Sequence, residues 1–291
     1  MSAPCAPVED LAFLPWRSAR GPVHGALRMG LAPIPEADWL PEPPDRDARL
    51  AARRTVLSAH PEQAHACPDA ARPAAEEALA LVAAHRGVDA PEAASPLLAA
   101  GTLVVDDLCL LEPGASGRLR AGLVTAPSGW RLDRRLGRDL RGLHGPVEDL
   151  EARLGARMRT FLERLAPGRI FERGNWFLYD DDRPWRPDDD ALGRVPRVLD
   201  EAPAVADHLW LRMERQTLRR LPRTGWLLFT IRPHFLPVHA LATEPAAAAD
   251  LATVIEGLDA TERRLRRLDR VGPGLLRFLH AAAGARRGIA S

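Results

Sequence analysis

The sequence contains no lysine, so all forty of its basic residues are arginine. Without lysine the chain has no Schiff-base residue for pyridoxal phosphate or aldolase chemistry, and no P-loop lysine for nucleotide phosphates. Thirty-nine acidic residues leave a formal net charge of +1. A chain this close to neutral has no overall field that would attract nucleic acid or an anionic membrane surface. We therefore expect neither nucleic acid nor a membrane as partner.

Cysteine and long apolar runs are also scarce. The three cysteines, Cys5, Cys67 and Cys109, are odd in number and widely spaced, which argues against a disulfide framework and a zinc knuckle. They are one short of the four thiolates that an ordinary iron–sulfur cluster takes from a single chain. No apolar run approaches the length of a membrane span, and the N-terminus lacks a basic segment followed by an apolar one. These absences predict a cytoplasmic protein with reduced thiols.

Several common cofactor and catalytic motifs are missing. The sequence has no GxGxxG after a strand, no HExxH, no GxSxG and no CxxCH. These patterns mark dinucleotide binding, zinc proteases, serine hydrolases and covalently attached heme, respectively. We therefore do not expect a self-contained flavin or nicotinamide enzyme, nor a covalently attached heme.

Hydrophobic periodicity predicts an α+β protein. Residues 1–45 are rich in proline and predict an extended arm, while residues 46–291 predict a single domain. Apolar residues recur at helical spacing in four stretches, residues 45–60, 71–85, 146–165 and 245–265, with a short last helix over 275–283. Five runs predict strands, at 103–111, 119–125, 175–179, 207–213 and 226–232. This order predicts about five mostly antiparallel strands flanked by N-terminal and C-terminal helices.

The segment 207–238 combines two of these strands with a large charge. Side chains alternate along a strand, so the first strand has an apolar face and a polar face, the latter carrying His208, Trp210, Arg212 and Glu214. Residues 216–223 resemble a short helical turn closed by Pro222 and Gly225. The pattern alone fits a solvated edge pair as well as a functional surface.

The exact residues of this segment are more specific than its hydrophobic pattern. The run ERQTLRRLPRTGWLLFTIR, residues 214–232, resembles the signature of the heme-dependent oxidative N-demethylase family. Three further blocks resemble the same family in the same order: DDLCLL at 106–111, PSGW with LGRDLRGLHGPV between 127 and 147, and RGNWFL at 173–178. The resemblance covers roughly residues 30–280.

This resemblance implies a fold, a cofactor and a reaction. It implies a PAS-like sheet that holds a noncovalent heme b, and dioxygen chemistry that oxidises a methyl group of a small secondary amine. The carbinolamine product then falls apart to formaldehyde and the shorter amine. Electrons come from separate reductase components with flavin and iron–sulfur centres, which agrees with the absence of motifs for either cofactor in this chain.

A b-type heme needs an axial donor, and His144 is the preferred candidate. His144 lies inside a matching block and just ahead of the helix predicted to begin at Pro146, whose N-terminal partial charge favours a neutral imidazole. The alternative is that His144 only caps that helix, with His234 or His239 as ligand. Glu214 is the candidate to accept the second ring N–H of the ligand, or else it forms an ordinary ion pair with Arg212 or Arg215.

The remaining candidates would surround the macrocycle. Guanidinium groups suit the carboxylates of heme propionates, so at least one of Arg173, Arg212, Arg215 and Arg232 is expected to bind heme. Arg232 and Trp176 are also predicted to act with Glu214 in catalysis. Trp130, Trp176 and Trp210 are expected to wall the slot, although a buried tryptophan is more often part of a core.

Two other functions remain open at this stage. One is a heme-binding sensor or carrier without turnover. The other is a biosynthetic tailoring oxygenase with a larger substrate, if the acidic loop at 180–206 borders the pocket. Fold resemblance alone does not identify the substrate.

Overall fold

Two eleven-residue strands, β6 (Trp210–Arg220) and β7 (Leu227–Pro237), form the centre of the computed structural model. They pair antiparallel from Trp210–Pro237 to Arg220–Leu227. The tight turn between them contains Gly225 with φ 73°. Glu77 accepts the backbone N–H groups of Arg223 and Thr224 in this turn at 2.5 and 2.8 Å. The structure describes residues 13–17, 30–114, 117–139, 142, 155–188 and 191–284.

The prediction of a helical turn over 216–223 is wrong, because β6 continues to Arg220. Its polar side chains find partners inside the protein, which favours the extended form over the local pattern. Thr217, for example, shares a 2.6 Å hydrogen bond with Thr230 of the neighbouring strand. The turn itself is confined to the residues around Pro222 and Gly225.

The sheet is open and antiparallel and has seven strands in the order β1-β5-β6-β7-β3-β4-β2. The remaining strands are β1 (Ala32–Ile34), β2 (His65–Ala66), β3 (Asp107–Leu111), β4 (Leu119–Leu123) and β5 (Ile170–Tyr179). The α+β class is confirmed, whereas the prediction of about five strands is too low. The two extra strands lie at the edges and have two or three residues, too few to show alternation in the sequence. One of them, β1, comes from the predicted N-terminal arm.

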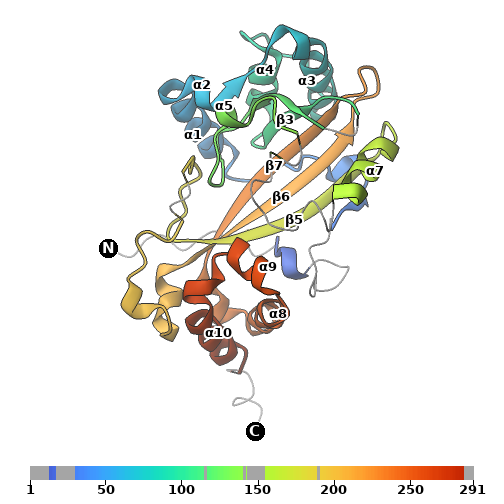
Figure 1. Ribbon diagram of the computed structural model, residues 1–291. Helices are drawn as coiled ribbons and strands as arrows, with labels where there is room; N and C mark the ends of the chain where they lie inside the picture. The colour runs from blue at the N-terminus through green and yellow to red at the C-terminus, as the bar shows by residue number, and fades with distance from the viewer. Residues whose placement is uncertain are drawn as a thin grey trace.

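Helices gather at the two ends of the long strands (Figure 1). The first group is α1 (Arg46–Ala59), α2 (Pro61–Ala64), α3 (Arg72–Arg86), α4 (Pro96–Leu103) and α5 (Leu132–Arg135). The second group is α8 (Pro245–Glu256), α9 (Ala260–Leu265) and α10 (Leu268–Gly284). The helices predicted at 45–60 and 71–85 are confirmed. None of the described helices has the length and apolar character that crossing a membrane requires.

The C-terminal helices differ from the prediction in where they break. The predicted helix 245–265 is divided between Glu256 and Ala260, because Asp259 begins α9 with a capping box. In this motif Asp259 and Glu262 accept each other's backbone N–H groups. The last helix is longer than predicted and already begins at Leu268. Of the helix predicted at 146–165, the structure describes α7 (Ala156–Arg164), while residues 143–154 lie outside the described part.

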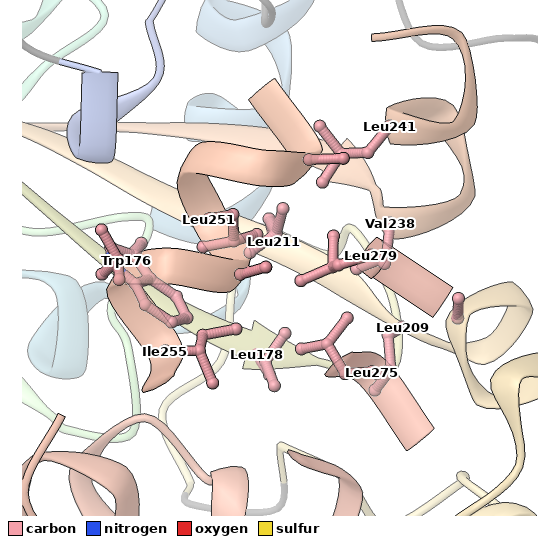
Figure 2. Close-up of a cluster of buried hydrophobic side chains, with 14 of the residues drawn as sticks. Trp176, Leu178, Leu209, Leu211, Val238, Leu241, Leu251, Ile255, Leu275 and Leu279 are labelled. Carbon is pink, nitrogen blue, oxygen red and sulfur yellow. The ribbon is translucent and has the colours of Figure 1, made fainter. Parts of the chain in front are cut away.

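The two faces of the sheet are named here by the side chains of β6. Face A carries Leu211, Met213, Arg215, Thr217 and Arg219, and face B carries Arg212, Glu214, Gln216, Leu218 and Arg220, because side chains alternate along a strand. Two apolar clusters cover opposite ends of face A. One, under α8 and α10, is shown in Figure 2 and includes Trp176 and Leu211; the other, under α3 and α4, includes Leu110 and Leu228. A third cluster, with Leu218 and Leu162 of α7, lies on face B.

We expect Gly274→Ala to destabilise the protein, although alanine is the better helix former. Gly274 lies inside α10, and a Cβ there would come within 2.6 Å of the Ala202 carbonyl oxygen. Relieving such an overlap should lower the free energy of unfolding by about 1–3 kcal/mol. Gly284→Ala in the same helix is the control, since its Cβ would meet no atom within 4 Å. Urea unfolding of both variants measures the difference, and equal midpoints would contradict the close approach.

Candidate functional site

The strand register separates the predicted site residues into two groups. Arg215 pairs with Arg232 across β6 and β7, and Trp176 pairs with Met213 across β5 and β6. All of these residues except Met213 were site candidates, and all of them lie on face A. Arg173, Arg212, Glu214 and Trp210 lie on face B. The structure therefore does not bring Glu214 together with Arg232 and Trp176, because these side chains project from opposite sides of one sheet.

The two arginines of face A are engaged in holding the fold. Arg232 donates from Nε and Nη2 to one oxygen of Asp106, at 3.2 and 2.5 Å, and both side chains are buried. Arg215 donates to the carbonyl oxygens of Trp39 and Asp38 at 2.8 and 2.5 Å, and forms an ion pair with Glu172. These contacts favour structural roles for both arginines over heme binding.

Trp176 belongs to the apolar cluster under α8 and α10 rather than to a slot (Figure 2). It is buried, and its ring meets that of Trp16 edge to face, with centroids 6.2 Å apart. The interpretation of Trp176 as a core residue, which was open in the sequence, is the one that the structure supports. Trp130 also packs on apolar residues, those of the third cluster, on face B.

Face B carries a buried polar group centred on Glu214. Its two carboxylate oxygens accept hydrogen bonds from Arg212 Nε at 3.1 Å and from Gln216 Nε2 at 3.0 Å. Arg212 also donates to the carbonyl oxygens of Pro184 and Ala126, at 3.2 and 2.5 Å. The ion-pair partner of Glu214 is thus Arg212 and not Arg215. Because all three guanidinium nitrogens of Arg212 already donate, Arg212 is poorly suited to bind a propionate.

Two connecting segments meet over this end of face B. Ser128 shares a 2.7 Å hydrogen bond with the Tyr179 hydroxyl, and Gly129 donates its backbone N–H to the Arg186 carbonyl at 2.9 Å. The guanidinium groups of Arg186 and Arg212 lie 5.1 and 5.8 Å from the centroid of the Tyr179 ring. Cations over an aromatic ring are attracted by its quadrupole. Tyr179 therefore holds the two connecting segments against the sheet.

The acidic run Asp180 to Asp190 suggests an exposed loop from its composition alone, but the structure shows that part of it is buried. Asp180 and Arg186 form an ion pair with side chains only 2% exposed, and Asp181 also pairs with Arg186, at 2.9 Å. Arg183 remains half-exposed and pairs with Asp181. The acidic residues are matched by arginines of the same loop, so the loop folds back on itself instead of extending into solvent.

Arg173 differs from the other arginines of the site. Its Nε is buried and has no hydrogen-bond partner among the described residues. Desolvation lowers the pKa of its guanidinium, and the charge of Glu214 acts in the opposite direction. A buried donor without an acceptor is unfavourable, so this position suits an anionic group. Of the four arginines proposed from the sequence, Arg173 is the one that retains a buried donor for a propionate.

The histidine candidates are placed unequally. His144 lies outside the described residues. His234 lies on face A, where its ring packs 5.0 Å from that of Phe13, and His239 is exposed in the short helix Val238–Thr243. His234 therefore projects from the face opposite Glu214, whereas His239 lies beyond the end of β7. The described residues contain no group of three or more His, Cys, Asp or Glu arranged to hold a metal ion.

Two arginines near the site were missed in the sequence. Arg266 lies 5.0 Å from the ring centroid of Trp176, and Arg267 lies 5.6 and 4.9 Å from those of Phe177 and Tyr179. Arg267 is also the only non-glycine residue with positive φ, 63°, in the part of the chain that the structure describes. The local pattern, two of several arginine pairs in an amphipathic helix, gave no signal that they reach β5.

A family model described as "Haem-dependent oxidative N-demethylase, alpha subunit-like" matches residues 85–276. The match covers strands β3 to β7 and all the site residues named from the sequence. It begins within the last turns of α3 and ends inside α10.

Proposed function

The chain belongs to the heme-dependent oxidative N-demethylase, alpha subunit-like family, and on this premise we propose that it is the heme-binding oxygenase subunit of an amine N-demethylase. The observation that supports the proposal is the buried Nε of Arg173, near Glu214, which has no hydrogen-bond partner among the described residues. A propionate is the kind of anion that would satisfy it. The bound heme would supply the activation of dioxygen.

In this proposal a noncovalent heme b would bind on face B of a PAS-like sheet. Arg173 would bind a propionate, and His144 would donate the axial nitrogen. Glu214 would accept the other ring N–H of His144, which raises the basicity of a ligating imidazole. Trp130 and Trp210 would supply apolar surface to the macrocycle. Helices cover both ends of face A, so we propose face B as the heme-binding face.

Glu214 is held in place and can accept a hydrogen bond from a ligating imidazole. Arg212 and Gln216 fix its two oxygens, and each oxygen retains a second lone pair that can accept a further hydrogen bond. The carboxylate is 6% exposed, so a further hydrogen bond to it would form away from bulk water and gain strength.

The proposed reaction is the oxidative removal of a methyl group from a small secondary amine. One oxygen atom of dioxygen enters the methyl C–H bond, the other leaves as water, and two electrons and two protons are consumed. The resulting carbinolamine breaks its C–N bond to give formaldehyde and the shorter amine. A separate reductase with flavin and iron–sulfur centres would supply the electrons, and we place this exchange in the cytoplasm.

Purified protein from heme-supplemented expression should show a Soret band, and acid–butanone should extract the heme completely, because the chain has no attachment motif. Colourless protein would contradict the proposal. Dioxygen consumption with a surrogate reductase and a panel of N-methylated amines then tests turnover. Gas binding without amine-dependent consumption would instead favour a sensor or carrier.

A further inference from the structure

The charge of the chain is unevenly distributed along the sequence. Residues 131–169 contain ten arginines and six acidic residues, a net charge of +4, whereas the whole chain has a formal net charge of +1. The rest of the chain is therefore acidic on balance. A strongly basic segment in a nearly neutral protein produces a local field that attracts partners of the opposite charge.

Exposed arginines present this charge on the surface in two groups. The first group belongs to α5 and the turn after it, and the second to α7 and the turn after it. None of these exposed side chains forms an ion pair within the described part of the chain, so their charges face the solvent. Together they are called the arginine rim, which consists of Arg134, Arg138, Arg157, Arg164 and Arg169.

Both groups lie at one end of face B, where α5 and α7 each contribute a leucine to the third apolar cluster (Figure 1). The turn after α5 is held to β4, because Gly137 donates its N–H to the Leu119 carbonyl at 2.7 Å. The end of α7 is held to β6 by Arg220, which donates to the Leu165 carbonyl at 2.7 Å. Strands β7 and β3 lie between β6 and β4, so these two anchor points are three strand spacings, about 14 Å, apart.

This separation indicates the size of the partner. A phosphate or a carboxylate cannot contact both groups, because it is much smaller than the distance between them. A folded protein with an acidic surface can face both groups, since a standard interface covers about 800 Å² of each partner. Exposed charges of this kind raise the rate of association more than the affinity. They therefore suit a partner that binds, reacts and leaves.

We propose that the arginine rim is the docking surface for the acidic electron-donor protein that reduces the heme. This inference rests on the proposed function, and it adds the surface of this chain and the charge of its partner. A nucleic acid or an anionic membrane could also span the rim, but neither supplies the electrons that the proposed reaction consumes. Each docking event would transfer one electron, which oxidises the iron–sulfur centre of the donor and reduces the ferric heme.

The position of the rim fits this role. Its two groups flank His144, the proposed axial ligand, in the sequence. Trp130, which is proposed to contact the macrocycle, packs on the same apolar cluster as α5 and α7. The electron donor would thus dock on the face of the sheet that is proposed to hold the heme.

The test measures how fast a photoreduced plant-type [2Fe–2S] ferredoxin, an acidic protein, reduces the ferric holoprotein at low and at high salt. The rim variant Arg134→Glu, Arg164→Glu reverses one exposed arginine in each group. The control variant Arg197→Glu, Arg277→Glu makes the same change in net charge at two exposed arginines outside the rim. Photoreduced 5-deazariboflavin, a small neutral reductant, reports the reactivity of the heme without docking.

The Soret band and the melting temperature show whether the rim variant is folded and loaded with heme. If charge reversal lowers either of them, Arg134→Gln, Arg164→Gln takes its place, because it removes the two charges without adding new ones.

We expect the wild-type rate constant to fall as salt is raised, because salt screens the attraction. At low salt the rim variant should be slower by about 10-fold, as expected when electrostatic steering is lost. The control variant should keep the wild-type rate constant, and deazariboflavin should reduce all forms equally.

Equal slowing in the rim and control variants, or a wild-type rate constant that does not depend on salt, would overturn the inference and leave the proposed function in place. Phosphatidylserine vesicles that sediment the wild type but not the rim variant, together with a salt-independent ferredoxin reaction, would assign the rim to a membrane surface and overturn the protein partner. Protein without a Soret band would remove the proposed function, and this inference with it.

Discussion

Arg232→Leu should lower the free energy of unfolding by about 3–5 kcal/mol, as expected when one partner of a buried ion pair is removed. Arg232 and Asp106 are 2% and 1% exposed, and Arg232 donates both its hydrogen bonds to one oxygen of Asp106. The other oxygen, Oδ1, is buried and has no hydrogen-bond partner among the described residues. The variant would leave this carboxylate without its closest cation. Urea unfolding followed by circular dichroism measures the loss.

Two controls identify the cause. The double variant Arg232→Leu, Asp106→Leu removes both charges and should recover much of the lost stability, because an apolar pair can replace a buried ion pair. Arg183→Leu removes a half-exposed ion pair with Asp181, which should change stability by less than about 1 kcal/mol. If Arg232→Leu keeps wild-type stability but loses amine or heme affinity, the structural assignment of face A fails and the catalytic interpretation of Arg232 returns.

His144→Ala should lose most of the bound heme or leave it without an axial nitrogen. His234 projects from the face opposite Glu214, and the proposal assigns the axial ligand to His144. The Soret and ferrous–CO spectra of the variant report the axial ligand directly. His239→Ala, at an exposed position, is the control and should leave both spectra unchanged. An unchanged spectrum in His144→Ala would mean that another histidine is the axial ligand.

Glu214→Gln should keep the heme but change its chemistry. The substitution retains size and one acceptor and removes the charge that makes a ligating imidazole a strong donor, so the ferric/ferrous potential should rise and amine-dependent oxygen consumption should fall by about 10- to 100-fold. Glu172→Gln is the matched control, since Glu172 is a partly exposed glutamate paired with an arginine on face A. A potential equal to that of the wild type would return Glu214 to being only the ion-pair partner of Arg212.

Long, strongly periodic elements were predictable from the sequence, and short or interrupted ones were not. The helices at 45–60 and 71–85 and the strand pair 207–213 and 226–232 are all present. The helical turn predicted over 216–223 failed because alternating polar residues found buried partners, such as Thr217 with Thr230. The strands β1 and β2 exist through pairing with β5 and β4, which no local pattern encodes.

The candidate site was predictable in composition but not in arrangement. Alternation along β6 correctly separated Arg212 and Glu214 from Leu211 and Met213. Which residues of two neighbouring strands share a face depends on the strand register. Because Arg215 pairs with Arg232, the side chain of Arg232 lies on the face opposite Glu214. Arg266 reaches β5 only because α9 and α10 pack against the sheet from a distant part of the chain. Such contacts depend on tertiary packing, so the spacing of residues in the sequence does not predict them.

The order of strands in the sheet has a consequence for synthesis of the chain. Strand β3 pairs with β7, which follows it by about 120 residues, whereas β6 pairs with β7 through a short turn. A growing chain therefore displays the buried strand β3, with apolar residues on both sides, long before its partner leaves the ribosome. Unpaired apolar strands invite association with other chains, and pairing across so long a separation is slow. The N-terminal helices α3 and α4, which pack on β3 and β4, emerge early enough to shield one face of β3 during this wait.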